Sequence, residues 1–305
     1  MLYLFGPTAV GKTSLSIELA KQINGEIISA DSMQVYRGMD IGTAKPTAEE
    51  RQGVPHHLID IRDPGDEWTV SDFVGECSRI SAEVKRKGKT PIIVGGTGLY
   101  LWSLIEGFAF PITPSDKELR ARLETIPTTT LYSQLSTIDP VAAAKIHLND
   151  KKRLTRALEV FELTGQPISE LQKLRIEEPQ RSVTGSKYNL FCLTLPREQL
   201  YERINQRVDR MIACGLIAEV KSLLAKGYKR ELPALQGLGY KEVIDYLNGG
   251  YPTEAAMIEE LKKRTRNFAR RQLTWFRRFK GTIWLDAQDQ SAALKAISNN
   301  LSENR

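Results

Sequence analysis

Eight consecutive residues near the start of the chain have the types and spacing to bind a phosphate. They match G-x-x-x-x-G-K-S/T and are Gly6, Pro7, Thr8, Ala9, Val10, Gly11, Lys12 and Thr13. The glycines let successive backbone N–H groups curl around an anion, and a helix N-terminus adds partial positive charge. Lys12 would supply a full charge, and the Thr13 hydroxyl could ligate Mg²⁺. The sequence therefore predicts a P-loop.

A carboxylate at Asp31 is the second candidate for chemistry. Many P-loop proteins that bind ATP or GTP end another apolar strand in an aspartate that helps to hold Mg²⁺. Here the run PIIVGGTGLY (91–100) ends in Gly-Gly-Thr, and the acid instead follows the apolar run at 26–30. Because the carboxyl ends of parallel strands surround the ligand crevice, Asp31, Thr97 and the P-loop should converge there. Asp31 would then be available as a base near a phosphate; a turn or N-cap role is the alternative.

The elements that must position these residues follow from hydrophobic periodicity. The expected strands are 2–5, 26–30, 90–96, 188–195 and 282–286, and the expected helices include 15–23, 73–88, 197–213, 215–226 and 253–279. Strands that alternate with helices predict βαβ units around a buried parallel sheet. From about 114 to 178 the sequence gives helix signals and no strand, with caps expected at Asp139 and Asp150.

The expected fold class is therefore α/β, with a P-loop NTPase-like parallel sheet flanked by helices and an all-helical insertion domain. Residues 1–113 and 179–305 should form the P-loop catalytic core with a C-terminal helical region. Residues 114–178 should form the helical insertion.

Composition limits the class of protein further. The 305 residues carry a formal net charge of +6 and an odd number of cysteines, three. The cysteines are far apart, so no disulfide framework is expected and a reducing compartment is the default. The N-terminus lacks a basic segment of the signal-peptide type, and no apolar run approaches the roughly 20 residues that span a bilayer. We expect a cytoplasmic protein without membrane contact, and nothing demands more than a monomer.

Charge is concentrated in one segment near the C-terminus. Residues 262–280 hold nine basic residues and no acidic one. Basic residues pair with nucleic-acid phosphates, so this segment predicts an RNA-facing surface. Its aromatic residues Phe268, Trp275 and Phe279 fall at helical spacing and are expected to pack in the core rather than stack on bases.

Several longer stretches carry a family resemblance. They are GPTAVGKT (6–13), ISADSMQVYRGMDIGTAKP (28–46), HHLIDIRDP (56–64), VGGTGLY (94–100), DPVAAAKIHLNDKKRLTRALEVFELTG (139–165), RINQRVDRMIACGLIAEV (203–220) and LQGLGYKEVIDYL (235–247). From residue 2 to about 285 the sequence resembles the bacterial tRNA dimethylallyltransferases, also called tRNA isopentenyltransferases. The resemblance implies transfer of a dimethylallyl group from dimethylallyl diphosphate to N6 of the adenine immediately 3′ of a tRNA anticodon, with release of diphosphate.

The resemblance also implies the roles of individual residues. The P-loop would hold the diphosphate, with Mg²⁺ as cofactor and Thr13 as its protein ligand. Asp31, Thr97 and Arg207 would be catalytic, with Asp31 as the base. The implied tRNA contacts are Asp31, Ser32, Met33, Gln34, Thr97, Arg120, Lys152, Arg153, Leu154, Thr155, Arg156, Gln236, Gly237, Leu238, Gly239, Tyr240 and Lys241.

Three other functions remain open on the residues alone. A P-loop kinase of a small molecule or nucleotide would bind ATP, but the Gly-Gly-Thr strand end and the basic segment argue against it. A transferase that prenylates free AMP would not need the tRNA-contacting stretches. An RNA-binding protein with a P-loop switch would not need a base at Asp31.

Overall fold

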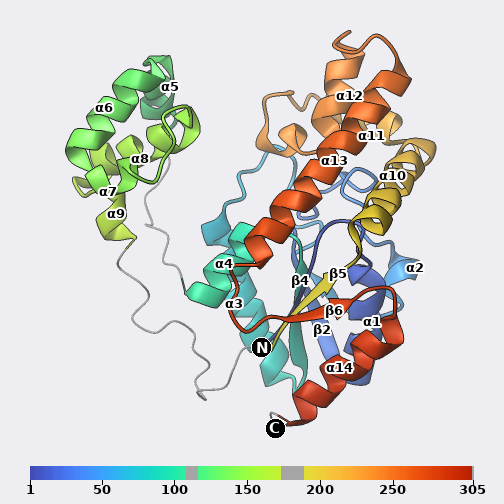
Figure 1. Cartoon of the computed structure of the whole chain (residues 1–305). Helices are drawn as coiled ribbons and strands as arrows, with labels where there is room; N and C mark the ends of the chain where they lie inside the picture. Colours follow the sequence, from blue (N-terminus) through green and yellow to red (C-terminus); the bar gives the residue numbers. More distant parts are fainter. Residues whose placement is uncertain (108–115, 173–188, 304–305) are drawn as a thin grey trace. The chain divides into compact units, whose positions relative to one another are not determined.

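A six-stranded sheet carries the P-loop at the end of its first strand (Figure 1). The computed structural model describes residues 1–107, 116–172 and 189–303, in two compact units: 1–102 with 181–305, and 103–180. The strands are β1 (Leu2–Phe5), β2 (Gly25–Ala30), β3 (His56–His57), β4 (Thr90–Gly95), β5 (Asn189–Thr194) and β6 (Ile283–Asp286). Their order is β3-β2-β4-β1-β5-β6, and every neighbouring pair is parallel. The predicted α/β class with a parallel sheet is confirmed.

The first unit also contains helices, and three of them, at 12–22, 70–86 and 290–303, make the main contacts with the strands. The helices are α1 (Lys12–Gln22), α2 (Ala48–Arg51), α3 (Val70–Arg86), α4 (Gly98–Glu106, which continues into the second unit from Ser103), α10 (Arg197–Ala213), α11 (Leu216–Ala225), the 3₁₀ turn η1 (Pro233–Gln236), α12 (Tyr240–Leu247), α13 (Glu254–Phe276) and α14 (Gln290–Glu303). The first of these, α1, starts inside the P-loop motif. The sequence does not predict α4, α12 or α14, nor the short elements α2 and η1.

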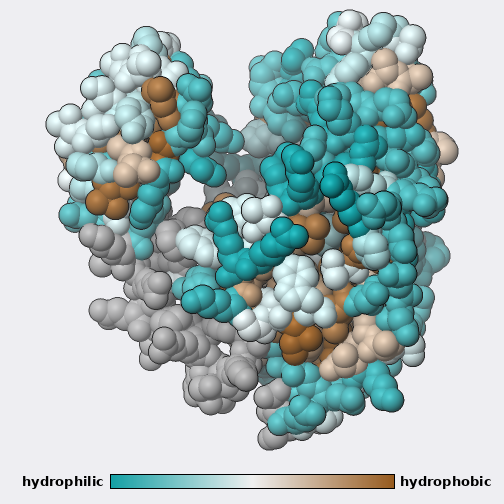
Figure 2. All heavy atoms as spheres, viewed as in Figure 1, coloured by the Kyte–Doolittle hydropathy of each residue, from teal (hydrophilic) through white to brown (hydrophobic). Residues whose placement is uncertain are grey.

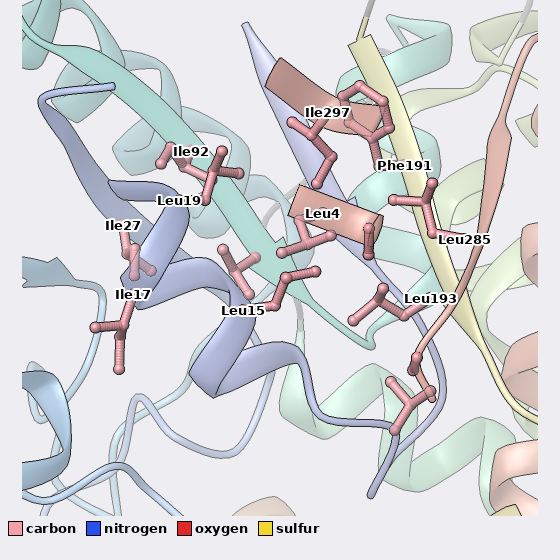
Figure 3. Close-up of a cluster of buried hydrophobic side chains, with 14 of the residues drawn as sticks. Leu4, Leu15, Ile17, Leu19, Ile27, Ile92, Phe191, Leu193, Leu285 and Ile297 are labelled. Carbon is pink, nitrogen blue, oxygen red and sulfur yellow. The ribbon is translucent and has the colours of Figure 1, made fainter. Parts of the chain in front are cut away.

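Alternation along the strands explains why both faces of the sheet are covered. Successive side chains of a strand point to opposite faces of the sheet. Since every residue of β1 is buried, both faces are covered at this strand. Leu4 points to the face that α1 covers with Leu15 and Leu19, and Ile297 of α14 packs into the same cluster (Figure 3). Fully burying a leucine or isoleucine contributes about 1.5–3 kcal/mol, so this cluster holds β1, and hence the P-loop, in a fixed position.

A second core joins the C-terminal helices to the segment that follows β2. Val35 and Met39 from that segment are buried with Val208 of α10, Val220 of α11 and Met257 of α13. The 31–46 segment, which carries Asp31, therefore packs against helices that lie far along the sequence.

The second unit is helical throughout its described part. Its helices are α5 (Lys117–Thr125), α6 (Thr128–Ile138), α7 (Pro140–Ala143), α8 (Lys151–Thr164) and α9 (Ile168–Leu171). The expected caps are present: Asp139 accepts from the Ala142 N–H at 2.9 Å, and Asp150 accepts from the Arg153 N–H at 3.2 Å. Asp139 supplies a second bond, since its other oxygen accepts from the Ser169 N–H at 2.8 Å and so ties α9 to α7.

A buried carboxylate organises the second unit. Glu159 of α8 is fully buried, and it accepts hydrogen bonds from the Asp116 N–H (3.1 Å) and from Arg120 and Arg156 (3.1 and 2.8 Å). Burial alone would raise the pKa of this carboxyl, but the bonds from Arg156 and Arg120 outweigh burial and hold its pKa below the usual range.

Replacing Glu159 with glutamine should destabilise the second unit by about 2 kcal/mol, because charged hydrogen bonds at a buried site are replaced by weaker ones. Amide hydrogen exchange in α8 should then be about 30-fold faster at pH 7. Since the folded-state pKa is lowered, this stabilisation is present above the ordinary glutamate pKa of about 4.3 and is lost as the pH falls through the lowered value.

Glu162→Gln is the matched control, because Glu162 pairs with Arg122 at the surface. Equal exchange rates in the two variants would contradict this role of Glu159.

Candidate active site

The P-loop is shaped by two residues with positive φ. Gly11 has φ +103° and Ala9 has φ +64°, and the latter conformation costs an L-residue free energy. Lys12 turns its ammonium back over the loop, where Nζ donates to the Gly6 and Pro7 carbonyls at 2.9 and 2.8 Å. Burial, with the Arg207 charge second, lowers the pKa of Lys12 to about 8. Two cations held close together in this way form a site for a highly charged anion.

Asp31 directly follows β2, as predicted, and it takes part in a turn. Its Oδ1 accepts from the Met33 N–H at 2.9 Å and from the Gln34 N–H at 3.3 Å. Among the described residues, Oδ2 takes no hydrogen bond. The turn role and the role as a base are therefore compatible, because one oxygen fixes the carboxylate and the other is available to accept a proton.

Thr97 ties the ends of two neighbouring strands together. It follows Gly95, the last residue of β4, and Gly96. Its N–H donates to the Ala30 carbonyl at 3.2 Å, and its Oγ1 accepts from the Ser32 N–H at 3.1 Å. The threonine therefore fixes the backbone on both sides of Asp31. Its hydroxyl hydrogen is left to donate elsewhere.

Arg207 reaches the site from α10. Its Nη2 donates to the Thr43 carbonyl at 3.4 Å. Burial lowers its pKa, an effect that the Asp31 carboxylate opposes and Arg210 reinforces. An arginine retains its charge at neutral pH even so, and Arg207 adds a permanent cation beside Asp31.

A cavity of 570 Å³ joins these residues, a size typical of small-molecule sites. Its lining includes Asp31, Thr97 and Arg207, together with Thr8 of the P-loop and the 236–242 segment. The convergence predicted from strand order is present. A wider cavity of 710 Å³, lined by Arg230, Tyr251 and Arg264 among others, contains none of the predicted site residues.

Glu219 of α11 is a site-positioning residue that no sequence pattern indicated. Its carboxylate accepts from the backbone N–H groups of Asp40, Ile41 and Gly42 at 2.8–3.1 Å. It also accepts from the Tyr240 hydroxyl at 2.7 Å, and burial raises the pKa of that phenol. A Cβ on Gly42 would overlap the Tyr240 ring. Glu219 and Tyr240 thus clamp the segment after Asp31, and Tyr240, which is 1% exposed, is part of that clamp.

Comparison with known proteins identifies the family. Residues 34–279 match a family model described as IPP transferase, and residues 1–66 match one described as isopentenyl transferase. A tRNA dimethylallyltransferase from Carboxydothermus hydrogenoformans is 50% identical over 295 residues, covering 95% of this chain and 93% of that protein. This chain belongs to the tRNA dimethylallyltransferase family.

Solved structures of the family share the fold. A full-length tRNA isopentenylpyrophosphate transferase from Bacillus halodurans has a TM-score of 0.72 at 44% identity, covering 99% of this chain and 95% of that one. A eukaryotic dimethylallyltransferase acting on tRNA has a TM-score of 0.83 at 32% identity, covering 100% and 80%. The sequence resemblance is therefore confirmed across the chain.

The structure narrows the RNA-contact prediction for the second unit. Leu154 and Thr155 are 0% and 2% exposed and lie on the face of α8 that packs inward, so the prediction is corrected for these two side chains. Arg156, like Arg120, is bonded to Glu159 and half-exposed. Lys152 and Arg153 are exposed and remain predicted contacts.

The basic segment 262–280 also contains two kinds of residue, those paired with acidic side chains and those exposed. Its first part is neutralised, since Lys262 pairs with Asp209, Lys263 with Glu260 and Arg264 with Glu242. The residues exposed further along are Arg270, Arg271, Arg277, Arg278 and Lys280. Hydrophilic side chains cover much of the surface along this helix in Figure 2.

The aromatic residues of this segment differ in environment. Phe279 is 3% exposed and packs edge-on against Phe5, as the core prediction required. Trp275 is half-buried against Trp102. Phe268 is also half-buried, but it lines the cavity with the Arg271 guanidinium over its ring. The core prediction is therefore wrong for Phe268, because its helix face borders the cavity rather than the sheet.

Two features of the described residues bear on metals and membranes. No group of three or more His, Cys, Asp or Glu side chains among them could hold a metal ion. No described helix is long and apolar enough to cross a membrane.

Proposed function

We propose that this chain transfers a dimethylallyl group from dimethylallyl diphosphate to N6 of the adenine immediately 3′ of the anticodon in tRNA. The observation that carries the proposal is the 570 Å³ cavity, which combines a P-loop residue, two polar strand-end residues and a half-buried arginine in a chain of this family. Its carboxylate, Asp31, follows β2, whereas P-loop NTPases commonly hold a metal-anchoring aspartate at a strand end that in this chain reads Gly-Gly-Thr.

The diphosphate end of the substrate fits the P-loop. Lys12 and Arg207 place two cations near the loop, whose backbone N–H groups can bind phosphate oxygens. When the bond between C1 of the allyl group and oxygen breaks, its electron pair leaves with the diphosphate. The fixed cations stabilise that developing charge, which is the usual source of large electrostatic rate effects.

The adenine end of the reaction needs a base. The N6 amine is a weak nucleophile because its lone pair is delocalised into the ring. As the new C–N bond forms, N6 must lose a proton, and Asp31 Oδ2 is the acceptor. Thr97 keeps this carboxylate in place through Ser32, so the base is oriented before substrate arrives.

The residues present fit a magnesium ion. Mg²⁺ keeps several waters and binds through one or two protein ligands plus substrate phosphates, so a site without a carboxylate cluster suits it. The exposed Thr13 hydroxyl at the start of α1 would be its protein ligand. When bound, the ion would neutralise charge on the leaving diphosphate.

The RNA end of the reaction requires an unstacked base. Bases in a tRNA loop can be splayed out at lower cost than bases in a duplex. The 236–241 segment lines the cavity beside Asp31, Ser32 and Met33 and offers polar groups for base edges. The exposed arginines of α13, with Lys152 and Arg153 of the second unit, would bind the backbone of the anticodon stem-loop.

A single labelling assay tests the proposed function. The chain is incubated with labelled dimethylallyl diphosphate and Mg²⁺, together with bulk tRNA or AMP. Label should appear in tRNA alone, and chelation of Mg²⁺ should abolish it. Label in AMP would favour the AMP-prenylating alternative, consumption of ATP a kinase, and RNA binding without transfer a non-catalytic protein.

Neutralising Arg270 and Arg277 together should weaken tRNA binding and reduce its dependence on salt. Both residues are exposed; Arg270 lies on α13, and Arg277 is its C-cap residue, about two helical turns further on. For every phosphate that the variant no longer binds, the slope of log affinity against log salt should fall by about one. Turnover at saturating tRNA should change little.

Lys263→Ala provides the matched control for this pair, because Glu260 already neutralises Lys263 on the same helix. Affinities are measured over a salt series for both variants. A double variant with the wild-type slope would show that this face of α13 does not bind phosphates.

A further inference from the structure

Gln272 is a buried polar side chain at the centre of the site that no motif indicated. It lies on α13 and is 5% exposed. Its Oε1 accepts from the Thr8 N–H at 2.9 Å, and its Nε2 donates to the Gly96 carbonyl at 2.9 Å. The orientation of the amide is unambiguous, since a backbone N–H can only donate and a carbonyl can only accept.

The two partners of Gln272 belong to different strands. Thr8 is in the P-loop after β1, and Gly96 follows β4. The next residue, Thr97, in turn holds Ser32 beside Asp31 after β2. A continuous series of hydrogen bonds and peptide units therefore runs from the phosphate loop through Gln272 to the residue next to the base.

Packing around the amide shows that the site is built to hold it. A Cβ on Gly96 would overlap Gln272 Nε2, so the glycine provides the space that the amide occupies. One turn further along α13, Phe276 is buried against Phe5 of β1. The helix therefore packs on β1 one turn beyond the amide, and the bonds to the loop and to Gly96 are made by Gln272 itself.

We propose that Gln272 is a positioning residue for the allylic diphosphate, an inference that rests on the proposed function. The amide fixes the peptide of Thr8 and so sets the direction in which the P-loop presents its N–H groups and Lys12. Without it, the loop loses one of its buried restraints and must be ordered by the ligand itself, which weakens binding of the diphosphate. The tRNA surface of α13 lies on its exposed residues, so tRNA affinity does not depend on this bond.

The test compares two variants at position 272 with a structural control. Gln272→Met keeps the length of the side chain and removes both hydrogen bonds. Gln272→Glu keeps an acceptor for the Thr8 N–H, but its carboxylate cannot donate to Gly96 and places negative charge beside the diphosphate. Phe276→Leu loosens the same helix one turn away and leaves the bridge in place. For each protein, calorimetry with inorganic diphosphate and Mg²⁺, the KM for each substrate and the melting temperature are measured.

The expected result is a split between the substrates. Gln272→Met should bind inorganic diphosphate about 10-fold more weakly and raise the KM for dimethylallyl diphosphate by a similar factor, the size of one to two missing hydrogen bonds. Gln272→Glu should be weaker still, and the KM for tRNA should stay within about twofold in both. Phe276→Leu should lower the melting temperature at least as far and leave diphosphate binding within about twofold.

Two results would overturn the inference. One is a Met variant that binds diphosphate like the wild type. The other is a Met variant whose losses for diphosphate and tRNA match each other and those of Phe276→Leu, since that is the pattern of general destabilisation. A wild-type chain that fails to bind diphosphate would instead overturn the proposed function itself, and the inference with it.

Discussion

Asparagine in place of Asp31 should lower turnover by about 10²-fold or more, the usual size of a general-base effect. Asparagine keeps a side-chain oxygen, so the bonds from the Met33 and Gln34 N–H groups that form the turn can persist. What is lost is the basic Oδ2 that takes the proton from N6. Affinities for diphosphate and tRNA should therefore change by less than about threefold. Single-turnover rates at saturating substrates, with separate binding measurements, check this expectation.

Asp63→Asn is the matched control for this variant, because Asp63 is exposed and pairs with Arg37 at the surface. It should react at the wild-type rate. An Asp31→Asn variant that also reacts at that rate would remove Asp31 from the mechanism, and a variant that loses tRNA affinity instead would make Asp31 a binding residue.

Methionine in place of Lys12 should lower kcat/KM for dimethylallyl diphosphate by about 10²- to 10³-fold, as expected for the loss of a preorganised charge at a leaving group. Lys12 also bonds the Gly6 and Pro7 carbonyls, so the loop loses a restraint as well as a charge. Binding of tRNA alone should be unaffected. Steady-state kinetics with each substrate varied in turn measures the effect.

Lys21→Met on the same helix serves as the control, since Lys21 is exposed at the far end of α1. It should leave kcat/KM unchanged. A Lys12→Met variant within about threefold of the wild type would show that the P-loop N–H groups and Arg207 suffice for the diphosphate, and that the Lys12 ammonium stabilises only the loop.

The sequence predicted those features whose cause is local. The P-loop requires only glycine spacing between a strand and a helix, and the place of Asp31 and Thr97 follows from one topological rule. Gln272 and Glu219 have no such local signal. Gln272 bonds a residue that is 264 positions away in the sequence, and Glu219 bonds three residues that are 177–179 positions away. In the sequence, a glutamine or glutamate on an amphipathic helix looks the same whether it bonds solvent or a distant backbone group.

The predictions that were wrong for Leu154 and Phe268 also have specific structural reasons. Leu154 lies on the same helical face as the buried Ala157 and Leu158, so the periodicity of α8 could have separated it from its basic neighbours. Phe268 could not be assigned in this way. Its helical spacing matches that of Phe279, and only the tertiary position of α13 decides which aromatic ring meets the sheet and which meets the cavity.

The last residue of β4, Gly95, and the residue after it, Gly96, bear on how P-loop scaffolds could exchange one chemistry for another. P-loop proteins that hydrolyse nucleotides commonly carry a metal-anchoring aspartate at such a strand end. In this chain a Cβ on Gly95 would overlap the Ala30 carbonyl of the neighbouring strand, and a Cβ on Gly96 would overlap Gln272. A side chain at position 95 would therefore require movement of the β2 backbone, and one at position 96 would displace the Gln272 amide. An aspartate here would come either with a change in the spacing of β2 and β4 or with loss of the contact between Gln272 and the P-loop, so the two glycines link the choice of chemistry to the packing around these strand ends.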